Sequence, residues 1–278
     1  MNDLNRCIEL LERKEKLVAL LAPSFPVMYD YPKIVARLKA LGFTHVIEVT
    51  AGAVRTNEAV ISLLKANPEA RFITSPCPGF VRLVRKSYPQ LLPYLAFKAD
   101  SPMIASAKIA KEKYPDCQTV FIGPCLAKKL ESSEDYPDLN LLVLTYRELD
   151  SVFQKFNIGD DVDATGAAFD VAEAGTRIYP MDGGLTITSG LRDILKEEEI
   201  RIVSGYKNIP AVLEEFGKNP KIRFVDVLFC DGGCINGPGM VSTLTLEERK
   251  KKIHDFAAQV KEIKDCHSTT GITPEKAL

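Results

Sequence analysis

The chain has 278 residues, of which 46% are hydrophobic and 26% charged. These values are typical of a globular protein and exclude disorder or a coiled coil. Because 36 Lys and Arg are balanced by 37 Asp and Glu, no net basic field attracts nucleic acid or an anionic membrane. The charged start MNDLNRCIELLERKEK is not a signal peptide, and no apolar run reaches the ~18 residues of a membrane span. We expect a cytoplasmic protein with no nucleic-acid or membrane partner.

Apolar runs alternate along the chain with segments of helical periodicity. A helix is predicted after Asn2 or Asp3, and a second one begins at Pro32 and ends at Gly42. The predicted strands are 17–21, 45–49, 71–74, 119–122, 141–144, 200–203 and 224–229. The other predicted helices are 58–65, 80–88, 102–114, 146–156, 191–198, 211–216 and 245–265.

This alternation predicts an α/β fold with mixed or parallel sheets flanked by helices. The segment 157–182 is acidic and irregular, and 157–163 is the predicted boundary between two lobes. The residues from 266 to 278 are polar, so we expect a frayed tail. Loops at the ends of parallel strands hold the site in such folds.

Four of the seven cysteines share a local pattern. Cys77, Cys125 and the pair Cys230 and Cys234 each follow an apolar run and lie in loops rich in Pro or Gly. Such loops can converge, and glycine lets backbone amides approach an anionic sulfur cluster. With only three His in the chain, four thiolates favour a 4Fe-4S cluster, with tetrahedral zinc as the competing alternative. For any single one of them, a buried apolar role is the default.

The other cysteines, Lys128 and His45 are weaker candidates for residues of the site. Cys7 lies on an apolar helix face, where we expect a core role. Cys117 and Cys266 have no supporting pattern. Lys128 is three residues past Cys125 and is either a partner of an anionic cofactor or a solvated charge, and His45 is expected to be structural.

Three segments, in order, resemble the catalytic domain of iron-only (FeFe) hydrogenases. TSPCPGF, GPCLAKKLE and CDGGCINGPG resemble the family signatures TSCCPxW, MPCxxKxxE and CxGGCxxGGG. The family's APS and Gly-Gly turn are matched at 22–24 and 183–184. The match covers about 15–245. The resemblance therefore implies a single two-lobed domain over 1–278, with an iron-sulfur site in the cleft between the lobes.

The resemblance also implies a ligand set. A 4Fe-4S cluster would be held by Cys77, Cys125, Cys230 and Cys234. The last of these would bridge to a diiron subcluster with carbonyl, cyanide and dithiolate ligands, which completes the H-cluster. Ser24 and Lys128 would donate hydrogen bonds to the cyanides, which need a fixed donor shell.

The departures from the family concern proton transfer. The thiol that passes protons, next to the first ligand, is replaced by Pro76. Gly123 and Met103 replace a methionine and a glutamine, and Glu58 is the one candidate carboxylate of the proton route. Because general acid-base catalysis contributes about a hundred- to ten-thousand-fold, we expect slow or sensory hydrogen chemistry (H2 = 2 H+ + 2 e−), and we assign no catalytic residue.

Electrons would come from a separate ferredoxin or iron-sulfur electron-transfer subunit, since no CxxCxxC run of a ferredoxin-like module is present in the sequence. A sensory role would add a signalling partner. Two alternatives stay open. One is a non-catalytic 4Fe-4S protein of electron transfer, redox sensing or cluster assembly, without the diiron subsite, which Pro76, Gly123 and Met103 favour. The other is a zinc-stabilised interaction module.

Overall fold

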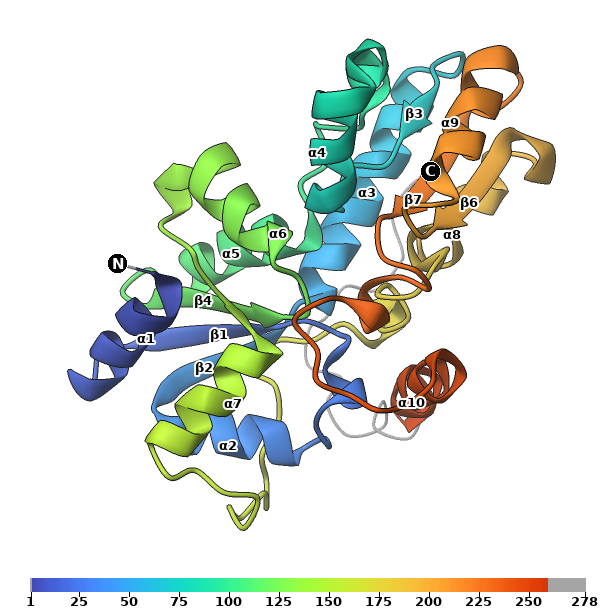
Figure 1. Cartoon of the computed structure of the whole chain (residues 1–278). Coiled ribbons are helices and arrows are strands. Elements are labelled where there is room, and N and C mark those ends of the chain that lie inside the picture. The colour runs from blue at the N-terminus through green and yellow to red at the C-terminus, as the bar shows by residue number, and fades with distance from the viewer. Residues whose placement is uncertain (1, 260–278) are drawn as a thin grey trace, which may run out of the picture.

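The computed structural model describes residues 2–259 and contains two parallel β-sheets with helices packed around them (Figure 1). The first sheet, in the order β2-β1-β4-β5, consists of β1 (Leu17–Leu21), β2 (Phe43–Glu48), β4 (Gln118–Gly123) and β5 (Leu142–Thr145). The second sheet, in the order β3-β7-β6, consists of β3 (Phe72–Ile73), β6 (Ile200–Ser204) and β7 (Phe224–Leu228). All pairs of these strands are parallel, which confirms the α/β class.

The helices occupy the segments between the strands, as the alternation predicts. They are α1 (Asp3–Glu12), α2 (Lys33–Leu41), α3 (Thr50–Ala66), α4 (Pro78–Ser87), α5 (Pro102–Lys113), α6 (Ala127–Leu130), α7 (Tyr146–Lys155), α8 (Gly184–Thr188), α9 (Ile209–Lys218) and α10 (Leu246–Ala258). In Figure 1, α1, α2 and α7 lie beside the first sheet, and α4, α8 and α9 lie near the second. None of the described helices is long and apolar enough to cross a membrane.

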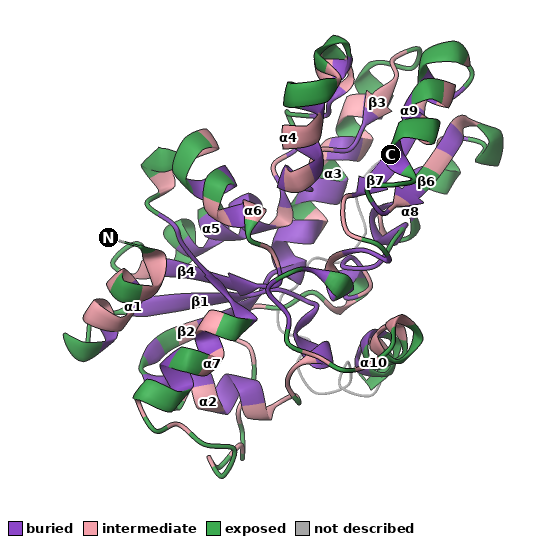
Figure 2. Ribbon diagram, viewed as in Figure 1, coloured by how far each residue is buried: buried purple, intermediate pink, exposed green. Residues whose placement is uncertain are grey.

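The central strands are apolar because parallel sheets are covered on both faces. All five residues of β1 are buried, as are all five of β7, and Figure 2 shows the strands of the first sheet as a continuous buried layer. Each sheet has its own hydrophobic cluster, and a third cluster contains Val60 and Leu64 of α3 together with Leu191 and Leu195. Helix α3 therefore contributes to two of the clusters, through Ala51 to that of the first sheet and through Val60 and Leu64 to the third.

Helix α3 joins the two halves and begins earlier than the sequence predicts. Its first turn packs closely on α5, where a Cβ on Gly52 would lie 2.2 Å from the carbonyl oxygen of Pro102. The Thr56 hydroxyl donates to the carbonyl of Asp100 at 2.8 Å. The small residues at 50–53 thus permit a close helix contact that apolar periodicity does not indicate.

Two predictions about the chain are wrong. The segment 191–198 contains only short 3-10 turns, at Leu191–Asp193 and Glu197–Glu199, because Lys196, with ψ 159°, is extended and interrupts the helical backbone between them. A single lobe boundary at 157–163 is also wrong. The chain passes from the first sheet to the second after β2, returns after β3 and crosses again after β5. The predicted C-terminal helix is present to Ala258. The predictions for 260–278, which include Cys266, lie outside the described residues.

Candidate metal centre

The four cysteines of the shared pattern lie in loops that follow β3, β4 and β7. Strands β3 and β7 are neighbours in the second sheet, and parallel neighbours end at the same edge. Their loops are therefore adjacent, and the Phe229 N–H donates to Cys77 Sγ at 3.4 Å. Cys77 also precedes α4 directly, so the loop of the first cysteine is anchored at both ends.

The acidities of the thiols indicate that all four share one site. Burial raises the pKa of Cys125 to about 11, with a further contribution from Cys77. Burial and the groups of Cys77 and Cys125 raise the pKa of Cys230 to about 12. The pKa of Cys234 is raised well above its usual value by burial and then by the other three cysteines. Such repulsion requires short separations, so the loops of both sheets bring these sulfurs together.

The four thiols do not surround a single ion. Between residues 2 and 259, no three His, Cys, Asp or Glu side chains are placed to hold one metal ion. Tetrahedral zinc would need every sulfur at ~2.3 Å from the metal. In a 4Fe-4S cluster each cysteine binds a different iron, which keeps the sulfurs further apart. A 4Fe-4S cluster and a zinc ion thus need different spacings of the four sulfurs.

Glycines bring the two cysteine loops into contact with the rest of the site. The Cys234 N–H donates to the carbonyl of Pro180 at 2.7 Å. At Gly233, with φ +97°, a Cβ would lie 2.5 Å from that same oxygen, so only glycine fits there. The Gly239 N–H donates to the carbonyl of Pro124 at 2.7 Å, which ties the last loop to the loop of Cys125.

A cavity of about 70 Å³ lies beside Cys234. Its wall combines residues from all the segments that carry the resemblance, namely Ser24, Pro76, Cys125, Lys128 and Cys234. It also contains Tyr179, which the sequence analysis did not select. Segments from both sheets thus meet at one largely apolar space next to the cysteines.

Ser24 lines this cavity and is fully buried. Its Oγ is 2.8 Å from the hydroxyl of Tyr146, and the Tyr146 hydroxyl donates to the carbonyl of Ala22 at 3.0 Å. A tyrosine hydroxyl has one proton, so Ser24 donates to Tyr146. The only proton of the serine is therefore used within the protein.

Lys128 is also fully partnered. Its ammonium donates to Glu131 at 2.6 Å, to the Ser101 hydroxyl at 3.0 Å and to the carbonyl of Pro76 at 3.1 Å. An ammonium group has three protons, so these three acceptors use all of them. Lys128 thus joins the loop before Cys77 to the α6 segment after Cys125.

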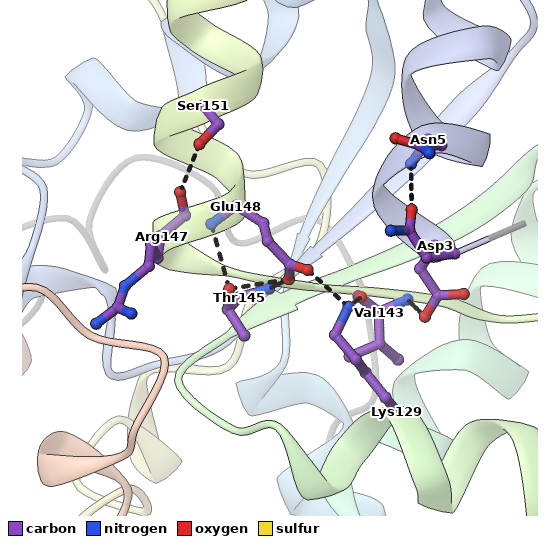
Figure 3. Close-up of polar contacts among 9 residues, drawn as sticks. Asp3, Asn5, Lys129, Val143, Thr145, Arg147, Glu148 and Ser151 are labelled. Atoms are coloured by element: carbon purple, nitrogen blue, oxygen red, sulfur yellow. Dashed lines mark hydrogen bonds and ion pairs between the residues drawn. The ribbon is translucent and has the colours of Figure 1, made fainter.

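The neighbouring lysine fixes α6 to the first sheet (Figure 3). Lys129 donates to the Val143 carbonyl at 2.8 Å and to Glu148 at 3.0 Å. Glu148 forms a capping box with Thr145 at the start of α7, and Asp3 of α1 accepts from the Val143 N–H at 3.1 Å. One carboxylate therefore caps α7 and holds α6, which positions Lys128.

The departures from the family lie around the cavity. Pro76 and Met103 both line it. At Gly123, a Cβ would lie 2.7 Å from the ring of Phe121, which also lines the cavity. The phenylalanine ring therefore fills space beside a residue that has no side chain. Glu58 is exposed on α3 and is not part of the cavity wall, and its place on a proton route stays a prediction.

In the described part of the chain, Cys7, Cys117 and His45 lie outside the candidate site. Cys7 is fully buried in the core of the first sheet, as predicted. Cys117 is partly buried outside the site. His45 stacks on Tyr114 with ring centroids 3.7 Å apart and lies 3.3 Å from Asp170, which confirms a structural role.

These features define an α/β protein in which four cysteines from loops of both sheets converge. The family model for the iron only hydrogenase large subunit, C-terminal domain, matches residues 15–238. The chain belongs to this family, as the three segments predict.

The curated relatives include both hydrogenases and assembly factors. Iron hydrogenase 1 of Clostridium pasteurianum is 28% identical over 84% of this chain and 50% of its own length. The NADP-reducing hydrogenase subunit HndD of Solidesulfovibrio fructosivorans is 30% identical over 74% of this chain and 45% of its own length. A probable cytosolic Fe-S cluster assembly factor, oxy-4 of Caenorhabditis elegans, is 26% identical over 81% of this chain and 61% of its own length. The chain spans about half the length of the first two relatives.

Solved structures agree with the fold. A variant of FeFe-hydrogenase HydA1 from Chlamydomonas reinhardtii has a TM-score of 0.68 and 18% identity, with 97% of this chain and 95% of that chain covered. A structure of the oxygen inactivation of an FeFe-hydrogenase has a TM-score of 0.70 and 17% identity, with the same coverage. At this identity the likeness establishes the two-sheet architecture alone.

Proposed function

We propose that the chain holds a 4Fe-4S cluster on Cys77, Cys125, Cys230 and Cys234. The observation that carries this proposal is the convergence of four thiols from loops of both sheets, of which Cys77 is buried and the other three are partly buried. Bound iron would replace the protons that burial now favours on these sulfurs.

We further propose that the cavity beside Cys234 receives a diiron subcluster. The donor set supports this, because Cys234 and Tyr179 line the cavity and the Tyr179 hydroxyl is buried without a hydrogen-bond partner among the described residues. When bound, the diiron group is where hydrogen is converted into two protons and two electrons. The chain would hold the group through Cys234 and enclose it with the walls of both sheets.

The chemistry would be slow or sensory, because the cavity wall carries a proline where a proton relay needs an acid. Pro76 has no proton to transfer, and Glu58 is turned to solvent. Loss of general acid-base catalysis costs about a hundred- to ten-thousand-fold in rate. A protein of this kind would report on hydrogen rather than consume it in bulk, through a signalling partner.

A second candidate is a 4Fe-4S protein without the diiron group, acting in electron transfer, redox sensing or cluster assembly. The observation that favours it is that all three protons of Lys128 are used within the protein. Relatives named as Fe-S cluster assembly factors agree with it.

Infrared spectroscopy and iron analysis distinguish the two. The protein is purified without oxygen and matured with a synthetic diiron mimic. About six irons per chain with cyanide and carbonyl bands supports the diiron proposal, whereas about four irons without bands supports the cubane alone. Fewer than about two irons, with one zinc, contradicts both.

For electron transfer, we infer a ferredoxin or an iron-sulfur subunit as the partner, because a cubane passes single electrons to another redox centre. Anaerobic reduction of the cluster by a reduced ferredoxin would test it. The cytoplasmic location stays a prediction, since the relatives' names include cytosolic and periplasmic proteins.

A further inference from the structure

Tyr179 has a buried hydroxyl with no hydrogen-bond partner among residues 2–259. Its side chain is only 8% exposed and lines the cavity beside Cys234. An unpartnered buried hydroxyl destabilises a folded protein, and most such groups in native structures have partners. The orphan hydroxyl therefore points to a partner that the chain itself does not supply.

The backbone fixes this tyrosine in place. The Tyr179 N–H donates to the Thr176 carbonyl at 3.0 Å. At Gly184, in the Gly-Gly turn, a Cβ would lie 2.7 Å from the Tyr179 Cα, so the turn can pack there only because it has no side chain. The next residue, Pro180, accepts from the N–H of Cys234. Tyr179 is thus held between the turn and the cysteine loop.

The other donors of the cavity wall are already used. The Ser24 proton goes to Tyr146, and the three protons of Lys128 go to Glu131, Ser101 and Pro76. Among the described side chains that line the cavity, Tyr179 is the one whose hydroxyl proton is free.

A trapped water is a poor partner for this hydroxyl. A buried water makes about three hydrogen bonds to polar groups. The wall of the cavity is largely apolar and includes Met103, Phe121 and Leu228. Asp226, the buried carboxylate that acts electrostatically on Tyr179, is not part of this wall and accepts from Thr186. A group that is held by its own covalent bonds, and that presents an acceptor atom, satisfies the hydroxyl without further polar partners.

We propose that Tyr179 donates a hydrogen bond to a terminal diatomic ligand, cyanide or carbonyl, of the iron group bound beside Cys234. This inference rests on the proposed function and adds a donor that none of the cysteine-bearing segments indicates. Phenylalanine at 179 would keep the packing and remove only the donor.

The test is the infrared spectrum of Tyr179→Phe after maturation with the diiron mimic. Wild type and variant are expected to show the cyanide and carbonyl bands, with at least one band shifted in the variant. The control is Tyr114→Phe, whose ring stacks on His45 away from the cavity and whose bands should match wild type. Identical bands in Tyr179→Phe overturn this inference alone. Absence of bands from the wild type overturns the diiron proposal and this inference with it.

Thermal unfolding provides a second measurement that does not depend on activity. Before the diiron group is loaded, Tyr179→Phe should unfold at a higher temperature than wild type, because it lacks the unpartnered hydroxyl. Loading should raise the midpoint of wild type more than that of the variant. An equal rise in both proteins contradicts a hydrogen bond from Tyr179.

Discussion

The ammonium of Lys128 lies 2.6 Å from the carboxylate of Glu131, and the two side chains are 11% and 8% exposed. Lys128 belongs to α6, and Glu131 begins the π-helical turn Glu131–Asp135 that follows it. Because Lys128 also donates to the Pro76 carbonyl, the ion pair links the loop of the first cysteine to the segment after the second. We expect this pair to hold two of the cluster loops in register.

Replacing Glu131 with Gln should destabilise the protein by about 3 kcal/mol, because a buried lysine loses its counter-charge. Removing both charges, in Lys128→Met with Glu131→Met, should cost clearly less, because no buried charge stays unpaired. The free energy of unfolding, from anaerobic urea titrations, measures both. A smaller loss in the single variant than in the double variant would contradict this account.

Serine at any of the four site cysteines should reduce bound iron sharply, because a cubane uses one thiolate per iron. Cys230→Ser is the simplest case, since Cys230 is partly exposed. The matched control is Cys117→Ser, which replaces another partly exposed cysteine outside the site and should keep its full iron content. Iron analysis and the visible absorption of anaerobic protein report the result. Full iron in Cys230→Ser would remove this residue from the ligand set.

Cluster stability should rise with pH. Burial first, and then neighbouring cysteines, raise the pKa of Cys125 to about 11 and that of Cys230 to about 12, so the empty site carries protons at every ordinary pH. Iron binding releases these protons, and each one released favours the cluster by ~1.4 kcal/mol per pH unit. More chelator should be needed to remove the iron at pH 8.5 than at pH 6.5, after correction for protonation of the chelator. A flat or opposite dependence would mean that the thiols are already ionised.

Much of the fold could be predicted because its strands are rich in apolar residues. β1 and β7 are buried along their whole length, and such runs are visible in the sequence. The interleaving of the two halves could not be predicted, since it depends on which strands pair. In the segment 191–198, Leu191 and Leu195 are buried and have helical spacing. They nevertheless pack in the cluster that contains residues of α3 without forming a helix.

The cysteines of the candidate site were visible because Pro and Gly mark their loops. The partners of the other site residues could not be identified from the sequence. Tyr146 meets Ser24 across 122 positions, and Tyr179 reaches the cavity only because Gly184 and Gly233 lack side chains next to its backbone and that of Pro180. Such roles depend on contacts between distant segments, for which local pattern contains no signal. The one local trace of Tyr179 is the Gly-Gly turn that follows it.

Cysteine at position 76 should restore proton transfer to the cavity. Pro76 lines the cavity, and its carbonyl accepts from Lys128 at 3.1 Å, a contact that any residue at this position can keep. In protein loaded with the diiron mimic, Pro76→Cys should raise the rate of hydrogen-deuterium exchange at least about tenfold, because general acid-base catalysis is worth about a hundred- to ten-thousand-fold. Pro76→Ala, which also releases the proline ring but adds no acid, should stay near wild type. Equal rates in the two variants would show that backbone freedom, rather than a missing proton donor, limits the chemistry.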